Sequence, residues 1–157
     1  MTNASTEPVT GSATTTIAAP IGEVFNAITD VTRMGEWSSE CVACRWVGDA
    51  TGPALGARFE GDNVATLGPI TAKRWTTTSE VVDVEPNSAF EFIAEEYSTW
   101  RYDFVEQGGA TTVTESFSYP QYTGWQKLVY GRLLNRQKAM ITGMQTTLDR
   151  VKQALEG

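Results

Sequence analysis

The chain has 157 residues, of which 41% are hydrophobic and 20% are charged, and its formal net charge is −7. This length fits one domain with a sizeable core. The acidic balance disfavours nucleic acid and anionic membrane surfaces as partners, because both are bound through clustered Lys and Arg. No signal pattern opens the chain and no apolar run approaches the roughly 18 residues of a membrane helix, so we expect a cytoplasmic protein without stable membrane insertion.

The sequence contains no histidine. This excludes Ser-His and Cys-His nucleophile pairs as well as imidazole metal ligands. Acid–base chemistry would have to come from Asp, Glu, Lys, Tyr or Cys side chains. We therefore expect no metal site and no cofactor.

The N-terminal third predicts a strand followed by two short helices. Residues 1–8 are polar and predict a flexible tail, and residues 9–157 predict a single domain. A strand is expected over 9–18, and a short amphipathic helix follows from about residue 20. Asp30 is placed to cap a second short helical turn.

After residue 40 the apolar residues alternate with a period of two, which predicts strands. The predicted strand ranges are 41–48, 56–66, 71–85, 88–96, 98–106 and 110–119. Pro86-Asn87 and Gly108-Gly109 are typical of hairpin turns, which favour antiparallel neighbours.

The chain closes with a helical pattern over about 122–155. A helix of ~34 residues would span ~50 Å, more than one small sheet, so a break is expected at Gly131 or near Tyr119-Pro120. The expected fold is α+β, with one antiparallel sheet whose concave face is covered by the long helix.

Alternation also predicts which strand residues face inward. Two polar residues, Asn63 and Glu115, fall on inner faces. A carboxylate between Val113 and Phe117 is costly unless a cation pairs with it, it is protonated, or a bulge near Gly108-Gly109 shifts the register. These polar groups and many aromatic rings fit a ligand pocket, although an aromatic stripe is also typical of a plain core. The predicted lining residues are Trp46, Phe59, Asn63, Trp75, Phe90, Phe92, Trp100, Tyr102, Phe104, Glu115, Phe117, Trp125, Met140 and Met144.

The two cysteines, Cys41 and Cys44, form a C-x-x-C spacing. In a regular strand, residues three apart point to opposite faces, so this pair is poorly placed to share a metal or close a disulfide. No helix pattern follows that would favour a redox motif. We expect two independent thiols, with Cys44 facing inward beside Trp46.

Several stretches resemble the polyketide cyclase/dehydrase and lipid-transport family of the START-like (birch-pollen-allergen-like) superfamily. They include A-A-P-I-G-E-V-F-N-A-I-T-D-V-T-R-M-G-E-W, G-A-R-F-E-G-D-N, K-R-W-T-T-T-S-E-V-V-D-V-E-P, S-T-W-R-Y-D-F and G-G-A-T-T-V-T-E-S-F-S-Y. The resemblance covers residues 10–155. It implies a helix-grip fold, with an antiparallel sheet around a long C-terminal helix, a cavity between them and two short helices after the first strand. It carries over no catalytic triad.

Three functions remain open from the sequence. The first is a non-catalytic binder or carrier of a small hydrophobic or amphipathic molecule, lipid-like or polyketide-like. The second is a cyclase or dehydratase without metal, in which Glu115 acts as acid or base and Asn63 or a tyrosine orients a carbonyl. The third is an interaction module such as a homodimer without a ligand.

Overall fold

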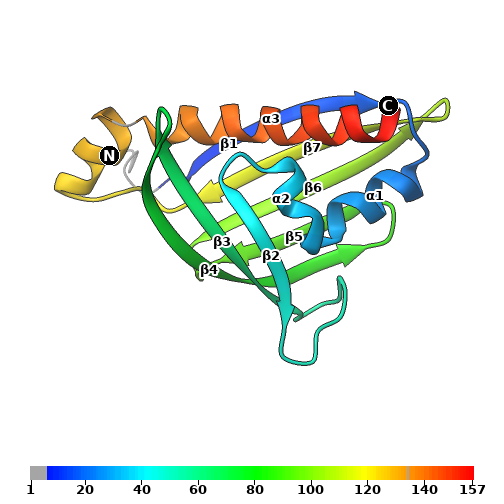
Figure 1. The fold of residues 1–157 in the computed structure, drawn as a ribbon, viewed down its shortest axis with the longest axis horizontal. Coiled ribbons are helices and arrows are strands. Elements are labelled where there is room, and N and C mark those ends of the chain that lie inside the picture. Colours follow the sequence, from blue (N-terminus) through cyan, green and yellow to red (C-terminus); the bar gives the residue numbers. More distant parts are fainter. Residues whose placement is uncertain (1–6, 134) are drawn as a thin grey trace.

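Seven antiparallel strands form one strongly curved sheet around a C-terminal helix (Figure 1). The computed structural model describes residues 7–133 and 135–157. The sheet order is β1-β7-β6-β5-β4-β3-β2, so the first strand and the second form opposite edges. The strands are β1 (Val9–Ile17), β2 (Cys41–Val47), β3 (Arg58–Leu67), β4 (Ile70–Glu85), β5 (Ala89–Ala94), β6 (Ser98–Gln107) and β7 (Ala110–Tyr119). This is the predicted α+β helix-grip fold.

The crossover from β1 to β2 contains the predicted short helices, α1 (Ile21–Thr29), η1 (Val31–Arg33) and α2 (Met34–Trp37). Asp30 caps η1, as predicted, because its carboxylate accepts a hydrogen bond from the backbone N–H of Thr32 at 3.1 Å. The predicted tail over residues 1–8 lies mostly outside the described residues.

The C-terminal segment differs from the single bent helix that its pattern suggests. A π-helical stretch, η2 (Lys127–Leu133), precedes the main helix, α3 (Arg136–Glu156). The break lies at Asn135, not at Gly131 or Pro120. Asn135 adopts a left-handed φ of 43°, and its side chain caps α3 by accepting from the N–H of Lys138. An asparagine tolerates this backbone and supplies the cap. In the described part of the chain, no helix is both long enough and apolar enough to cross a membrane.

The hydrophobic core lies between α3 and the sheet. Met140, Met144, Leu148 and Val151 on α3 are buried. On the sheet side, burial alternates perfectly along β7, so Glu115 faces inward as predicted. The β6–β7 pairing is continuous from Gln107↔Ala110 to Thr99↔Ser118, so the alternative of a register shift near Gly108-Gly109 is wrong.

The far edge of the sheet is tied to α3 through the α2–β2 connection. Arg150 on α3 donates from Nη1 to the carbonyl oxygens of Trp37 at 3.2 Å and Ser38 at 3.1 Å. At the other end of α3, Arg136 donates to the Glu40 carboxylate at 3.1 Å. One edge strand, β1, packs on α3 directly, whereas the β2 edge reaches it through these bonds.

A glycine permits α2 to approach β2 closely. A Cβ on Gly35 would collide with the backbone carbonyl of Val42. Gly35→Ala is therefore expected to lower the free energy of unfolding by about 1–3 kcal/mol, measured by urea denaturation. Gly22→Ala is the matched control, because a Cβ there would meet only Asn87 Oδ1 at 4.0 Å. If the two variants had equal free energies of unfolding, this result would contradict the close approach of α2 to β2 at Gly35.

Candidate functional site

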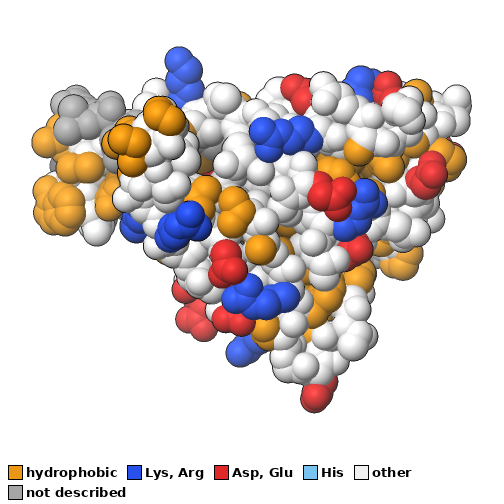
Figure 2. All heavy atoms as spheres, viewed as in Figure 1, with side chains coloured by type: hydrophobic (Ala, Val, Ile, Leu, Met, Phe, Trp, Pro, Cys, Tyr) orange, Lys and Arg blue, Asp and Glu red, His pale blue; other side chains and the backbone are white. Residues whose placement is uncertain are grey.

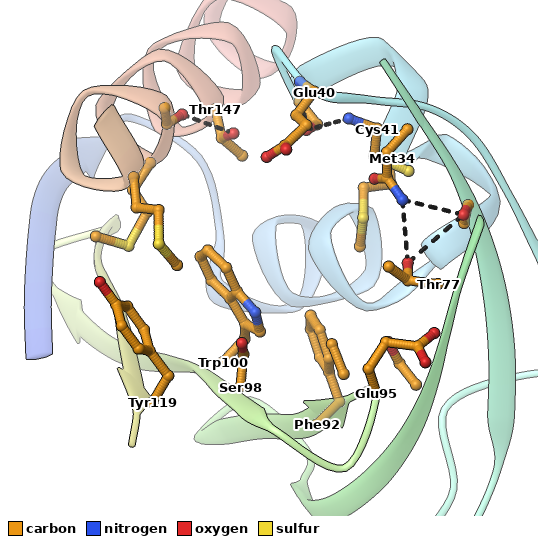
Figure 3. Close-up of a pocket in the computed structure, with 18 of the residues that line it drawn as sticks. Met34, Glu40, Cys41, Thr77, Phe92, Glu95, Ser98, Trp100, Tyr119 and Thr147 are labelled. Atoms are coloured by element: carbon orange, nitrogen blue, oxygen red, sulfur yellow. Dashed lines mark hydrogen bonds between the residues drawn. The ribbon is translucent and has the colours of Figure 1, made fainter. Parts of the chain in front are cut away.

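A cavity of about 360 Å³ lies between the sheet, α3 and the α2–β2 connection. Figure 3 shows how the elements contribute to it: Phe92, Trp100 and Tyr119 rise from the sheet, Thr147 projects from α3, and Met34 comes from the opposite side. Apolar surface, to which aromatic rings and methionine side chains contribute, makes most of the wall, and polar groups interrupt it at separate points. This combination is typical of small-molecule sites.

The structure brings many of the predicted lining residues together along this cavity. They are Phe59, Asn63, Trp75, Phe92, Trp100, Tyr102, Glu115, Met140 and Met144. Contact between these side chains and a ligand stays a prediction. The other predicted residues, Trp46, Phe90, Phe104, Phe117 and Trp125, do not line this cavity.

Ring packing explains four of these differences. Phe90 is fully buried beside Phe92 and Tyr102, with ring centroids 5.7 and 6.5 Å away. Phe104 packs edge-on against Phe25 of α1 at 5.1 Å. These inward rings therefore fill core rather than border space.

Two further rings, Trp46 and Phe117, pack against residues that do line the cavity. Trp46 lies 5.6 Å from Phe59, and Phe117 lies 5.6 Å from Trp100. In each pair only the neighbour lines the cavity, which strand alternation alone does not reveal.

The sequence pattern predicts that Trp125 lines the cavity, and this prediction is wrong. The side chain is 69% exposed. It precedes η2, outside the regular part of α3. Figure 2 shows apolar side chains gathered at the end of the molecule formed by this segment and the β3–β4 hairpin tip. The exposed apolar residues there include Leu67, Ile70 and Leu128.

Several lining residues escaped the sequence prediction. Thr77 and Ser79 share the inner face of β4 with Trp75, so alternation contained their signal. Others come from the start of the short helix α2 or from irregular segments, whose orientation no period predicts: Met34, Ser38, Ser39, Glu40, Glu95, Tyr97 and Tyr122.

Glu115 is the buried acid of the cavity. It is 4% exposed, and its Oε1 accepts a hydrogen bond from the Tyr102 hydroxyl at 2.8 Å. Its Oε2 is buried and meets no hydrogen-bond partner among the described residues. Burial raises the pKa of Glu115 to about 8, although the Tyr102 hydrogen bond acts in the opposite direction. At neutral pH the protonated carboxyl is therefore the main form, and no described Arg or Lys forms an ion pair with it.

Tyr102 stays protonated beside this acid. Burial is the largest cause that raises the pKa of its hydroxyl, and the negative charge of an ionised Glu115 raises it further. The pair thus supplies neutral hydrogen-bonding groups rather than charge. Asn63, the other predicted inward polar residue, is satisfied within the wall, since its Nδ2 donates to Gly61 O at 3.1 Å and to Thr77 Oγ1 at 3.2 Å.

The two cysteines lie on the same face, which contradicts the expectation of opposite faces. A β-bulge in β2 is the reason: Cys41 pairs with Asn63, whereas Ala43 pairs with Asp62. The extra residue, Val42, points outward and is 51% exposed. Cys41 and Cys44 consequently both line the cavity as free thiols.

Comparison with known proteins identifies the family to which this fold and sequence correspond. A family model described as polyketide cyclase / dehydrase and lipid transport matches residues 8–156. The chain belongs to this family. The resemblance to this family that the sequence predicts is thereby confirmed. A search of curated proteins found no match.

Solved structures agree with the family assignment. The chain is 33% identical to a Polyketide_cyc-like protein of Corynebacterium glutamicum, with a TM-score of 0.64 over 96% of this chain and 93% of the other. The fold also resembles a protein of Mycobacterium smegmatis, at 18% identity and a TM-score of 0.65 over 94% of this chain and 90% of the other. The di-domain ARO/CYC protein StfQ of the steffimycin biosynthetic pathway is 12% identical, with a TM-score of 0.72 over 96% of this chain and 51% of the other.

The raised pKa of Glu115 makes stability depend on pH. The carboxyl titrates near 4.5 in the unfolded chain and at about 8 in the folded protein. Between these values the folded state holds a proton that the unfolded state has lost. The free energy of unfolding is therefore expected to fall as the pH rises through this window, by at most about 1.4 kcal/mol per pH unit. Urea unfolding at several pH values measures this slope.

Glu115→Gln should remove that contribution, because the amide does not titrate. Tyr102→Phe should raise the pKa of Glu115 further, since the lost hydroxyl is the donor that lowers it. Carbon-13 NMR of the carboxyl group follows this pKa directly. If the free energy of unfolding varied with pH in the same way in the wild type and in Glu115→Gln, this result would contradict a buried, protonated carboxyl at Glu115.

Proposed function

We propose that the chain binds or carries a small, largely apolar molecule in the cavity between the sheet and α3. The supporting observation is the cavity itself, about 360 Å³ in volume with a mostly apolar wall. Ligand sites commonly occupy roughly 300–1,000 Å³ and combine such walls with a few polar groups. The family description, which names both cyclase/dehydrase activity and lipid transport, supports a ligand of lipid-like or polyketide-like chemistry.

The polar groups of the wall suggest that this ligand is amphipathic. A protonated Glu115 keeps Oε1 for the Tyr102 hydroxyl and can donate from Oε2, which has no described partner. A ligand carbonyl, ether or hydroxyl oxygen would satisfy that donor. Arg136 and Glu40 form a partly exposed ion pair elsewhere on the wall, where a second polar group of the ligand would remain hydrated.

A second candidate function is favoured by the same acid. A carboxyl with a pKa of about 8 can exchange a proton at neutral pH, which a cyclase or dehydratase requires. In a dehydration, Glu115 would give its proton to a hydroxyl that leaves as water, and the resulting carboxylate would accept the proton from the carbon next to the carbonyl, which restores the protonated acid. Tyr102 would hold the carboxyl in place.

Filling part of the cavity should weaken binding without unfolding the protein. Gly143 lines the cavity on α3, and a Cβ there would meet only Ser39 Oγ, at 3.5 Å. Gly143→Leu is expected to weaken binding of the amphipathic dye anilinonaphthalene sulfonate at least about tenfold, or 1.4 kcal/mol. Fluorescence titration measures this, because the cavity tryptophans Trp75 and Trp100 should be quenched by the bound dye.

Thr142→Leu is the matched control, because Thr142 is the preceding residue of α3 and is exposed. It places the same side chain outside the cavity and should leave dye affinity unchanged. Equal dye affinity of the two leucine variants, or no binding by the folded wild type, would sink the proposed cavity function.

Glu115→Gln separates the two candidate functions. In a catalyst, this variant should lose about 100-fold or more in the dehydration of a β-hydroxy ketone to an enone, followed by ultraviolet absorbance. In a carrier, neither protein turns over, and the affinity for the intact ketone changes by about 1–3 kcal/mol. Glu95→Gln is the control, because Glu95 lines the cavity but is exposed. Unchanged turnover and affinity in Glu115→Gln would exclude Glu115 from the site.

A further inference from the structure

The bulge in β2 aligns two thiols that a regular strand would separate. Cys41 lies opposite Asn63 and Cys44 lies opposite Gly61 on β3. Asn63 and Gly61 are two residues apart in a regular strand, so they share one face, and the cysteines opposite them share it too. Because the bulge residue Val42 absorbs the extra position, the C-x-x-C segment presents both sulfur atoms to the cavity.

The absence of a side chain on Gly61 leaves the two sulfurs facing the same space. A Cβ at Gly61 would lie 3.2 Å from Cys41 Sγ and 3.7 Å from Cys44 Sγ. Both sulfur atoms are therefore close to one point. Cys41 Sγ donates to the carbonyl oxygen of Ala43 at 3.3 Å, and the neighbouring thiol is the largest cause that lowers the pKa of Cys41 and raises that of Cys44, which is consistent with this proximity.

We propose that Cys41 and Cys44 form a chelating dithiol site in the cavity wall that binds one soft, thiophilic metal or metalloid centre. Soft ions prefer thiolate ligands, and a centre such as Hg(II) or a trivalent organoarsenical is satisfied by two of them. Zinc is disfavoured because it needs four ligands, and no cluster of three or more His, Cys, Asp or Glu side chains exists in the described part of the chain. The site goes beyond the proposed carrier function and does not depend on it.

The binding step exchanges protons for the bound centre. Each thiol loses its proton as its sulfur takes one coordination position. With an arsenic oxide, R–As=O, two As–S bonds form, the As=O bond is lost, and both protons leave with that oxygen as one water molecule. No oxidant or reductant takes part, since sulfur and arsenic keep their oxidation states. The product places the metalloid against the cavity.

Phenylarsine oxide is the probe that tests the chelate, under reducing and anaerobic conditions. Native mass spectrometry of the wild-type protein should show one equivalent bound, with loss of one water, and retained against excess glutathione. A dithiol such as dithiothreitol should remove it. Cys41→Ser and Cys44→Ser should each weaken retention at least 100-fold, because a single thiolate forms no chelate. Hg(II) should show the same one-to-one stoichiometry, and Zn(II) should not be retained.

The decisive control keeps two cysteines in the same segment. The double variant Cys41→Ser, Val42→Cys moves one thiol to the exposed bulge position. It should behave like the single serine variants if geometry forms the site. Circular dichroism and dye binding confirm that each variant is folded. Retention by this variant equal to wild type, or wild-type retention no better than that of the single variants, would overturn the proposal.

Discussion

One helix cannot cover the inner face of a seven-stranded sheet, and the cavity of this protein follows from that constraint. The 21 residues of α3 pack mainly on β1, at one edge. The strong curvature of the sheet brings the other edge back toward the helix, where Arg150 bonds to the end of α2. The middle strands are thus left facing a space that side chains only partly fill (Figure 3).

Burying polar groups in this wall costs free energy, and most of them form hydrogen bonds or ion pairs with neighbouring groups. The Asn63 amide bonds to its own strand and to β4, and the Arg136–Glu40 pair is partly exposed. Glu115 is the exception, because one of its oxygens has no partner among the described residues. In the function that we propose, the protonated acid donates from this oxygen to an oxygen atom of the ligand. Carrier and catalyst differ only in what happens after that hydrogen bond forms.

Regular periodicity made much of this structure predictable from the sequence. The alternation in β7 placed Glu115 inward, and the Gly108-Gly109 turn set its hairpin with β6. Irregularities were not predictable, because they depend on contacts between distant segments. The bulge at Val42 lies where β2 meets Gly35 of α2, and it reversed the orientation expected of Cys41. Similarly, no local pattern reveals which inward ring borders empty space and which is covered by a neighbour.

The central claim is that a ligand occupies the space between α3 and the sheet. Three of the four methionines, Met34, Met140 and Met144, line that cavity from two different elements. NMR of protein labelled with carbon-13 in the methionine methyl groups, titrated with an apolar aromatic ligand, tests the claim directly. The account predicts that all three methyl signals shift together and saturate at one equivalent. Saturable binding that leaves these three signals unmoved would place the ligand elsewhere and contradict the account.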